Sequence, residues 1–324
     1  MLTELAERGL AGEGAPGGYR GLVLAEAEGP EPFFGLRSVH HVVRFLAEAR
    51  LAGRGLEDVL AALEPVAVPG MGRGRSFAVR VHRRGEHGFR SPDLERAYGA
   101  LLVDRYRDPV DLERPELRVR VDLFQDRLFL GLQLTDAPLS RRYPKVYLPP
   151  AALKTTVAYG MLRLAGVEEK GRLLDAFTGS GTIAIEAAQT FPGLAVVATD
   201  RSERALAGAR ANAEAAGVSG RVEFVLADAR RFSGFADGSF DWIVANPPFG
   251  RRLGRGSDLR ALYARFLDQA GRLLAPGGTL AMLVRRRGWL DRLVRERPEL
   301  RVRSVRVLEL GGLYVGLFLI QRRG

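Results

Sequence analysis

Phe240-Asp241-Trp242-Ile243-Val244-Ala245, followed by Asn246-Pro247-Pro248-Phe249-Gly250, is the stretch that decides the fold of this chain. The apolar run predicts a buried strand, because Val, Ile and aromatic residues favour that environment. The two prolines stop the strand, since each fixes φ and lacks an N–H. An amide, a carbonyl and an aromatic ring are thus held at a strand end, where they could hold a flat base that bears an amino group. A strand that runs into a proline-rich turn is the alternative interpretation.

The rest of the C-terminal half alternates strands and helices around this stretch. We expect strands at 172–177, 195–200, 221–228, 240–245 and 279–284, helices at 182–188, 202–217, 257–276 and 289–297, and a closing hairpin at 305–310 and 314–320. This order predicts an α/β fold with a doubly wound, Rossmann-like sheet and right-handed crossovers. The sheet should have seven strands, and the hairpin makes the last one antiparallel.

The N-terminal half predicts two smaller units. Residues 1–65 form a small α/β unit with strands at 22–25, 33–36 and 38–47 and a helix at 56–63, which stops before a proline. A segment rich in glycine and proline follows at 66–74 and marks a boundary. Residues 75–148 predict a strand at 76–84, a capped helix at 91–102 and a hairpin of 117–124 with 128–134.

Composition points to an anionic partner. The 324 residues carry a net charge of +11, and nearly all of the positive charge is arginine, because only three residues are lysine. Such a basic chain suggests nucleic acid, although a mutational bias toward arginine would explain Arg over Lys. There is no cysteine, and the four histidines show no metal-ligand spacing, so we expect no metal. No apolar run reaches bilayer length and the first residues are acidic and helical, so we expect a cytoplasmic protein without a signal peptide.

Polar and glycine residues gather where the strands end. Open α/β sheets bind ligands outside the carboxyl ends of their strands. Gly179 and Gly181 let the backbone approach a ligand, Asp200 can accept both ribose hydroxyls, and Asp228 can accept from an adenine amino group. Asp175 ends the first strand, near the cationic end of such a ligand.

The stretch 179–184 also fits the dinucleotide fingerprint G-x-G-x-x-G/A, so an NAD-dependent oxidoreductase is an alternative. Three features argue against NAD: the acidic walls, the Asn-Pro-Pro-Phe strand end and the antiparallel last strand. A cationic sulfonium ligand suits acidic walls better than a pyrophosphate does.

Residues 75–148 resemble a THUMP domain, both in the order of elements and in the segments 77–81 and 91–93. The resemblance implies binding to the acceptor end of tRNA or to structured RNA, with a ferredoxin-like unit in front. We therefore predict a ferredoxin-like domain at 1–65, a THUMP domain at 66–150 and a Rossmann-fold methyltransferase domain at 151–324.

Residues 151–324 resemble the class I S-adenosylmethionine-dependent methyltransferases, in particular the THUMP-linked tRNA and rRNA guanine-N2 enzymes. The motifs are Asp175-Ala176-Phe177-Thr178-Gly179-Ser180-Gly181-Thr182, Asp200, Asp228-Ala229, Asn246-Pro247-Pro248-Phe249-Gly250 and the segment 151–156. Family enzymes often have Pro at the position of Ala176 and Cys at that of Thr178. The resemblance implies that S-adenosyl-L-methionine is held by Thr155, Asp175, Thr178, Gly179, Ser180, Gly181, Asp200, Asp228, Ala229 and Asn246. It also implies that Asn246, Pro247 and Phe249 form the catalytic site.

These residues predict a tRNA methyltransferase that makes N2-methylguanosine. The Asn246 side-chain oxygen and the Pro247 carbonyl can each accept one N–H of the guanine amino group, and Phe249 can stack on the base. The resemblance is nearest to enzymes that act on position 6 of the acceptor stem, where the base must be flipped out. The arginines of the segment 251–255 would hold phosphates, or form a solvated loop. We expect a monomer.

Besides the NAD-dependent oxidoreductase, three other functions remain open at this point. An rRNA guanine-N2 or a DNA adenine-N6 methyltransferase could use the same Asn-Pro-Pro-Phe group, and the THUMP-like half disfavours DNA. A non-catalytic RNA-binding protein with a decayed domain is the third, and the intact Asn246 and glycine loop argue against it.

Overall fold

The computed structural model describes residues 1–150, 152–249, 259–285, 287–310 and 312–324. It divides the chain into two compact units, Met1–Leu139 and Ser140–Gly324. Three features of the sequence analysis lie outside the described residues: the start of the helix predicted at 257–276, the arginine segment 251–255 and the motif residue Gly250. No helix in the described part of the chain is long and apolar enough to cross a bilayer.

The second unit contains a seven-stranded sheet of order β12-β13-β11-β10-β7-β8-β9. Its strands are β7 (Arg172–Asp175), β8 (Ala195–Asp200), β9 (Val222–Leu226), β10 (Phe240–Ala245), β11 (Leu274–Val284), β12 (Leu300–Leu310) and β13 (Leu313–Arg322). The first five pair in parallel, whereas β13 pairs antiparallel with both β11 and β12. The predicted seven-stranded Rossmann-like sheet with an antiparallel last strand is confirmed.

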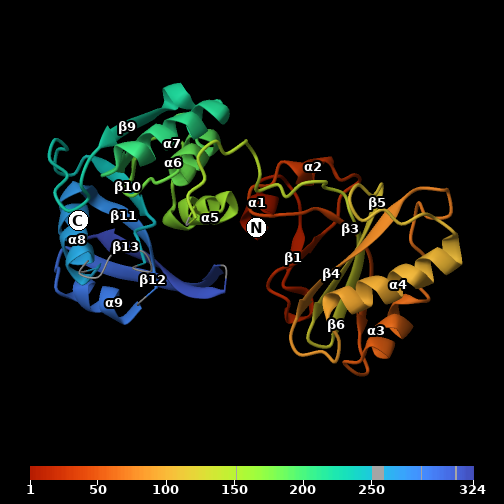
Figure 1. Ribbon diagram of the computed structural model, residues 1–324. Helices are drawn as coiled ribbons and strands as arrows, with labels where there is room; N and C mark the ends of the chain where they lie inside the picture. The colour runs from red at the N-terminus through yellow and green to blue at the C-terminus, as the bar shows by residue number, and fades with distance from the viewer. Residues whose placement is uncertain (151, 250–258, 286, 311) are drawn as a thin grey trace. The chain divides into compact units, whose positions relative to one another are not determined.

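Helices cover both faces of this sheet (Figure 1). They are α5 (Thr155–Ala165), α6 (Thr182–Thr190), α7 (Glu203–Ala215), α8 (Leu259–Leu273) and α9 (Arg287–Arg295). One apolar core contains residues of α5, α6 and α7, and the other contains residues of α8 and α9. A short 3-10 turn, η2 (Ser219–Arg221), leads into β9.

Strand β10 lies in the middle of the sheet, as its composition predicts. It pairs with β7 on one side and β11 on the other, and Ile243, Val244 and Ala245 are fully buried. Successive residues of a strand point to opposite faces, so Ile243 and Ala245 enter one core and Val244 the other. Continuous apolar runs are typical of parallel strands covered on both faces. Asn246 therefore leaves the sheet from a rigid, central position.

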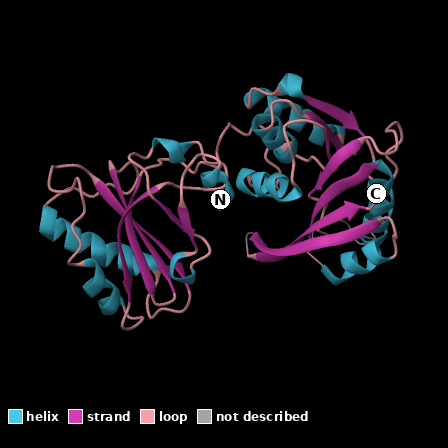
Figure 2. Ribbon diagram, turned by 180° about the vertical axis from the view of Figure 1, so that it is seen from behind, coloured by secondary structure: helices cyan, strands magenta, loops and turns pink. Residues whose placement is uncertain are grey.

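The first unit contains a four-stranded sheet of order β3-β6-β5-β4. The strands are β3 (Val43–Arg50), β4 (Phe77–Arg84), β5 (Leu117–Phe124) and β6 (Arg127–Gln133). Helices α3 (Leu56–Leu63) and α4 (Ser91–Tyr106) pack on one face of it, around a single apolar core (Figure 2). The predicted hairpin is present as β5 and β6, and α3 and α4 lie where helices were predicted.

The first 40 residues differ from prediction in two places. They form α1 (Leu2–Ala6), β1 (Gly12–Gly14), η1 (Pro16–Gly18), β2 (Val23–Ala25) and α2 (Glu31–Phe34). The strand expected at 33–36 is wrong: Pro30 and Pro32 fit the first turn of a helix, and their missing N–H groups would break a sheet ladder. The strand expected at 38–47 begins only at Val43.

The predicted domain boundaries stay predictions. Strand β3 comes from the range 1–65 and pairs antiparallel with β6, which comes from the range 66–150. One sheet therefore takes strands from both sides of the predicted boundary at residue 65.

Strand β12 forms one edge of the larger sheet and is unusually exposed. Val305 and Val307 are 42% and 51% exposed, and Tyr314 on the neighbouring strand is 70% exposed. Arg301, Arg303 and Arg306 of β12 are exposed as well.

Candidate active site

The carboxyl ends of the parallel strands surround a cavity of about 600 Å³ in the second unit. It is lined by the residues that follow β7, β8, β9 and β10, together with a segment before α5 and part of α8. The lining residues are Pro149, Ala152, Leu153, Ala176, Phe177, Thr178, Gly179, Ser180, Thr182, Ile183, Asp200, Arg201, Ala227, Asp228, Ala229, Arg230, Asn246, Pro248, Ala261, Leu262 and Arg265. Seven predicted site residues are among them: Thr178, Gly179, Ser180, Asp200, Asp228, Ala229 and Asn246.

The glycine loop between β7 and α6 adopts a backbone that favours glycine. Gly179 and Gly181 have φ of +51° and +82°. The Gly179 N–H donates to Asp200 Oδ2 at 3.0 Å, which ties the loop to the end of β8. A Cβ on Gly181 would lie 3.2 Å from the Ala209 Cβ, so Gly181 lets the loop pack on α7 rather than face the cavity.

The two acidic residues of the cavity wall differ in their surroundings. Asp200 accepts from the backbone N–H groups of Gly179 and Ser202, each at 3.0 Å. Each of its oxygens keeps a second lone pair for a ligand hydroxyl. Asp228 is held by the Arg230 side chain, whose Nε lies 2.9 Å from Asp228 Oδ1. Those hydrogen bonds keep the pKa of Asp228 at about 2, so the carboxylate is ionised at neutral pH.

Asp175 lies behind the cavity wall. Its side chain is fully buried and accepts from Thr178 Oγ1 at 2.8 Å and from the Ala184 N–H at 3.2 Å. Burial raises its pKa to about 7, against the effect of these hydrogen bonds. It therefore supports the loop that carries Thr178.

Three other predicted residues also lie outside the cavity wall. Thr155 is buried at the start of α5 and its hydroxyl donates to the Ser140 carbonyl at 2.7 Å. Pro247 is buried, and Phe249 is half-buried and packs against the core that contains α5 and α6. The Pro248 carbonyl accepts from the Tyr263 hydroxyl at 3.0 Å, which fixes the turn after β10.

Asn246 presents an unused acceptor at the cavity. Its Oδ1 is buried and has no hydrogen-bond partner within the described ranges. A buried acceptor without a partner costs about 1–3 kcal/mol. Its position in the cavity wall fits a ligand that brings an N–H donor.

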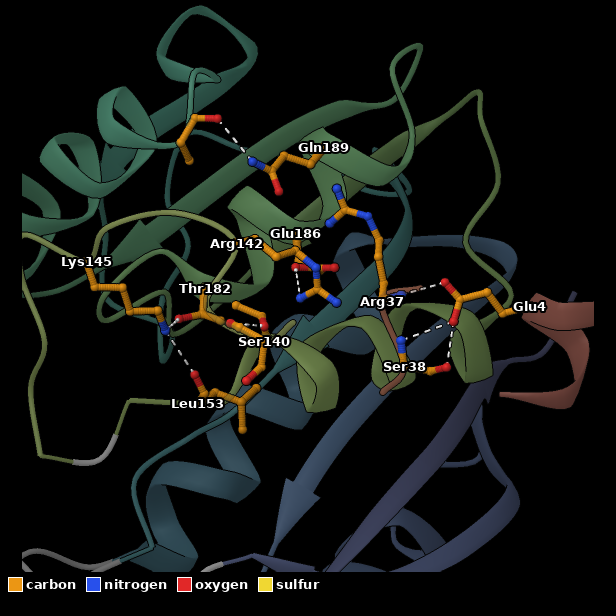
Figure 3. A network of polar contacts seen from close by, with 12 residues as sticks. Glu4, Arg37, Ser38, Ser140, Arg142, Lys145, Leu153, Thr182, Glu186 and Gln189 are labelled. Atoms are coloured by element: carbon orange, nitrogen blue, oxygen red, sulfur yellow. Dashed lines mark hydrogen bonds and ion pairs between the residues drawn. The ribbon is translucent and has the colours of Figure 1, made fainter. Parts of the chain in front are cut away.

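Two residues that the sequence analysis did not single out hold this wall in place. Asn212 of α7 is fully buried, accepts from the Tyr147 N–H at 2.9 Å, and donates to the carbonyls of Tyr147 at 2.7 Å and Ser180 at 2.9 Å. Lys145 donates to the carbonyl of Leu153 and to the hydroxyl of Thr182 (Figure 3). Asn212 lies 65 positions from Tyr147, and Lys145 lies 37 positions from Thr182, so no local pattern marks either residue.

Comparison with known proteins agrees with this geometry. Residues 141–315 match the family described as RMKL-like, methyltransferase domain, and residues 54–133 match the THUMP domain. A tRNA (guanine(6)-N2)-methyltransferase of Thermus thermophilus is 45% identical over 297 residues, which are 90% of this chain and 86% of that protein. One of Archaeoglobus fulgidus is 32% identical, over 71% of this chain and 65% of that protein.

Solved structures give the same result. The crystal structure of TrmN from Thermus thermophilus has a TM-score of 0.79 and 43% identity, and the match covers 93% of this chain and 88% of that one. The structure of SMU.472 complexed with SAH, at 20% identity, has a TM-score of 0.76 and shows the shared fold. The chain therefore belongs to the RMKL-like methyltransferase family and carries a THUMP domain before its methyltransferase domain.

Proposed function

We propose that this protein transfers a methyl group from S-adenosylmethionine to the N2 atom of a guanine in tRNA. The observation that carries the proposal is Asn246 Oδ1, which is buried in the wall of the cavity at the end of β10 and has no partner among the described residues. An exocyclic amino group supplies the N–H that this oxygen lacks. The family and the tRNA guanine-N2 methyltransferases among its relatives support the proposal, and they disfavour an NAD-dependent oxidoreductase.

The cavity fits the methyl donor. Asp200 has lone pairs left for ribose hydroxyls, and Asp228 is an ionised acceptor for an adenine amino group. The glycine loop brings backbone close to the ligand, and acidic walls suit a sulfonium cation. S-adenosylmethionine, when bound, supplies an electrophilic methyl group on that sulfonium.

The chain's own residues position the base. The N2 lone pair of guanine is delocalised into the ring and is a poor nucleophile. Asn246 Oδ1 accepts one N–H of the amino group, and the Pro247 carbonyl accepts the other. These two hydrogen bonds orient the amino group and favour a lone pair that points at the methyl group. Phe249 would stack on the base with the face that its core packing leaves uncovered. Positioning is then the main catalytic contribution, and no strong base is needed before transfer.

Arginines also lie on the sheet of the first unit, although that unit as a whole is not basic, because Met1–Leu139 has 19 arginines against 21 Asp and Glu residues. Strands β4 and β5 pair in parallel, with Arg80 opposite Arg120 and Ala78 opposite Arg118. These residues alternate with apolar ones that face α3 and α4, so the cations lie on the other face of the sheet. Arg118 is paired there with Asp136, and Arg120 with Asp122. We propose that the THUMP domain binds the acceptor end of tRNA.

Three finer points belong to the same proposal. The target is position 6 of the acceptor stem, in line with the names of the relatives, and that base is flipped out of its pair. We also propose that the protein is a cytoplasmic monomer.

The test is incubation of the protein with labelled S-adenosylmethionine and matched tRNA transcripts, followed by digestion to nucleosides. One transcript carries guanine at position 6, and the other carries an A–U pair there. We expect label in N2-methylguanosine with the first transcript only. Label with both transcripts would move the target elsewhere in tRNA. Label in N6-methyladenosine, or only with rRNA or DNA, would overturn the proposed substrate.

A further inference from the structure

The net positive charge of the chain lies in its second unit. The whole chain has 49 Lys and Arg residues against 38 Asp and Glu residues. Met1–Leu139 contains 19 of these cations and 21 of the acids, so Ser140–Gly324 has 30 cations against 17 acids. Residues 285–324, which include β12 and β13, hold 11 arginines against four acids. A polyanion is therefore attracted to the second unit, and most strongly to this C-terminal part of it.

Two arginines of the edge strand β12 are available to bind an anion. Arg303 and Arg306 are exposed, and neither has a hydrogen bond or an ion pair with any residue that the structure describes. Arg301 of the same strand differs from them, because it donates to the Gln321 side chain at 2.6 Å. An unpaired guanidinium group keeps all five of its N–H donors for a ligand. The geometry of those donors suits phosphate oxygens.

An apolar strip, formed by Val305, Val307 and Tyr314, accompanies these arginines. All three side chains are exposed, and that of Tyr314 is 70% exposed. Val305 is paired with Phe318, which is buried in the core that contains α8 and α9. Paired residues and every second residue of a strand point to the same face, so the strip lies on the face that these helices cover elsewhere. At the end of the hairpin this face is open to a partner.

The end of the hairpin lies at the same edge of the sheet as the cavity. Strand β11 runs parallel to β10, and its pairing with β13 ends at Val284. Strands β12 and β13 stay paired beyond that level, up to Leu310 and Leu313. The hairpin therefore continues past the carboxyl ends of the parallel strands, where Asn246 lines the cavity (Figure 1).

The register also gives the distance between the hairpin and the end of β10. Ala245, the last residue of β10, lies opposite Met282, which in turn lies opposite Phe318. Tyr314 is four positions from Phe318 on β13, so it lies about 13 Å away along the strands and about 10 Å away across the sheet. The resulting distance of about 16 Å corresponds to about five base pairs of a duplex. A stem that delivers a flipped base to the cavity is thus long enough to touch the hairpin.

We propose that the edge strand β12 and the end of the β12–β13 hairpin bind the RNA stem beside the target base. Arg303 and Arg306 hold phosphates, and Tyr314 packs against a ribose. Contacts to phosphate and sugar fix the register and orientation of a duplex without reading its sequence. This surface therefore orients the stem at the cavity. The inference rests on the proposed function for the identity of the partner as RNA.

The test measures binding of the tRNA transcript with guanine at position 6 to the full chain, across about 50 to 200 mM salt. We expect the double variant Arg303→Gln, Arg306→Gln to bind this transcript at least about tenfold more weakly at the lowest salt. The slope of log K against log salt should fall by about two, since each phosphate contact contributes about one. The Kd for S-adenosylhomocysteine should change by less than about twofold, which shows that the variant is folded.

Two single variants separate charge from packing. Tyr314→Ala should weaken tRNA about fivefold and leave the salt slope unchanged, because a tyrosine carries no charge at neutral pH. Arg323→Gln is the matched control, because Arg323 is exposed and follows the opposite end of β13. It should change neither the affinity nor the slope.

An unchanged slope in the double variant, or an equal loss of slope in Arg323→Gln, would refute this surface. A dimer of the unmutated protein in sedimentation experiments that Tyr314→Ala dissociates would assign the strip to a second copy of the chain, and would also overturn the inference. If the unmutated protein neither binds nor methylates tRNA, the proposed function itself fails. That result differs from binding and methylation that do not depend on Arg303 and Arg306, which refute this surface alone.

Discussion

At the residue scale, two buried oxygens define how the site works. Asn246 Oδ1 and Asp175 Oδ1 both lack a hydrogen-bond partner among the described residues. Asn246 lines the cavity and can gain a partner from a ligand, whereas Asp175 does not line it. The first oxygen is therefore the one that we propose to recognise the target amine. The second belongs to a carboxyl group whose burial disfavours the charged form.

The role of Asn246 predicts a selective loss of chemistry. Asn246→Ala removes the acceptor that we propose to orient the target amine, so kcat for tRNA methylation should fall on the order of 10²- to 10³-fold. The Kd for S-adenosylhomocysteine should change by less than about fivefold, because Asp200 and Asp228 remain. Single-turnover assays and calorimetry measure the two quantities. If cofactor affinity is lost together with activity, Asn246 holds the donor rather than the base.

Asp175 predicts a pH dependence of stability. Its pKa is raised from 3.8 to about 7 in the folded protein, so between these values the native state binds more protons than the unfolded state. Its contribution to stability is thus favourable at low pH and is lost as pH rises from about 4 to about 7. Each unit of pKa corresponds to about 1.4 kcal/mol, so the change amounts to a few kcal/mol.

Asp175→Asn should remove that contribution. Urea unfolding of both proteins from pH 4 to pH 8 measures it: the variant should gain stability relative to the parent as pH rises through this window. A constant difference between the two proteins across the window would show that Asp175 does not titrate there.

At the element scale, Asn212 of α7 joins two segments of the cavity wall. It bonds both backbone groups of Tyr147 and the carbonyl of Ser180 in the glycine loop. Asn212→Ala leaves these buried groups unpaired, which should lower the free energy of unfolding by about 2–4 kcal/mol and weaken S-adenosylhomocysteine. Glu214→Ala, on the exposed side of the same helix, is the control. Similar unfolding curves for both variants would deny Asn212 this role.

The sequence predicts elements well where the pattern is local. The run before Asn246, the helix expected from residue 202 and the final hairpin all depend on neighbouring residues. In the structure the Ser202 hydroxyl caps that helix by accepting from the Ala205 N–H. The seven residues that line the cavity follow from a general property of parallel sheets, that strand ends meet at one edge. The prediction of a strand at 33–36 was wrong. Its two aromatic residues suggested a strand, whereas the two nearby prolines favour the first turn of a helix.

Contacts over long sequence distances could not be predicted. Lys145 meets Thr182 across 37 positions, and Asn212 meets Tyr147 across 65. Neither residue carries a motif of its own, and a lone lysine or asparagine is usually a surface residue. The sequence also does not reveal that Asp175 is buried. Its burial depends on the packing of α6 and not on the residues beside it in the sequence.

At the scale of the whole molecule, the net charge of +11 sets how the protein meets RNA. Binding that neutralises two or more phosphates releases counterions, so tRNA affinity should fall at least about tenfold between about 50 and 200 mM salt. Filter binding across this range measures the slope. S-adenosylhomocysteine, whose site combines acidic and basic residues, serves as the reference and should vary much less. A tRNA affinity that is independent of salt would argue against phosphate contacts by the basic surface.

The exposed edge strand β12 has a consequence for self-association. A long edge of unpaired backbone with Val305 and Val307 outward could add a strand from a second molecule and begin aggregation. Arg301, Arg303 and Arg306 stand along the same strand, so a second copy paired edge to edge would bring guanidinium groups against each other. Like charges in such a pair repel, and this edge is therefore protected against aggregation by its own sequence.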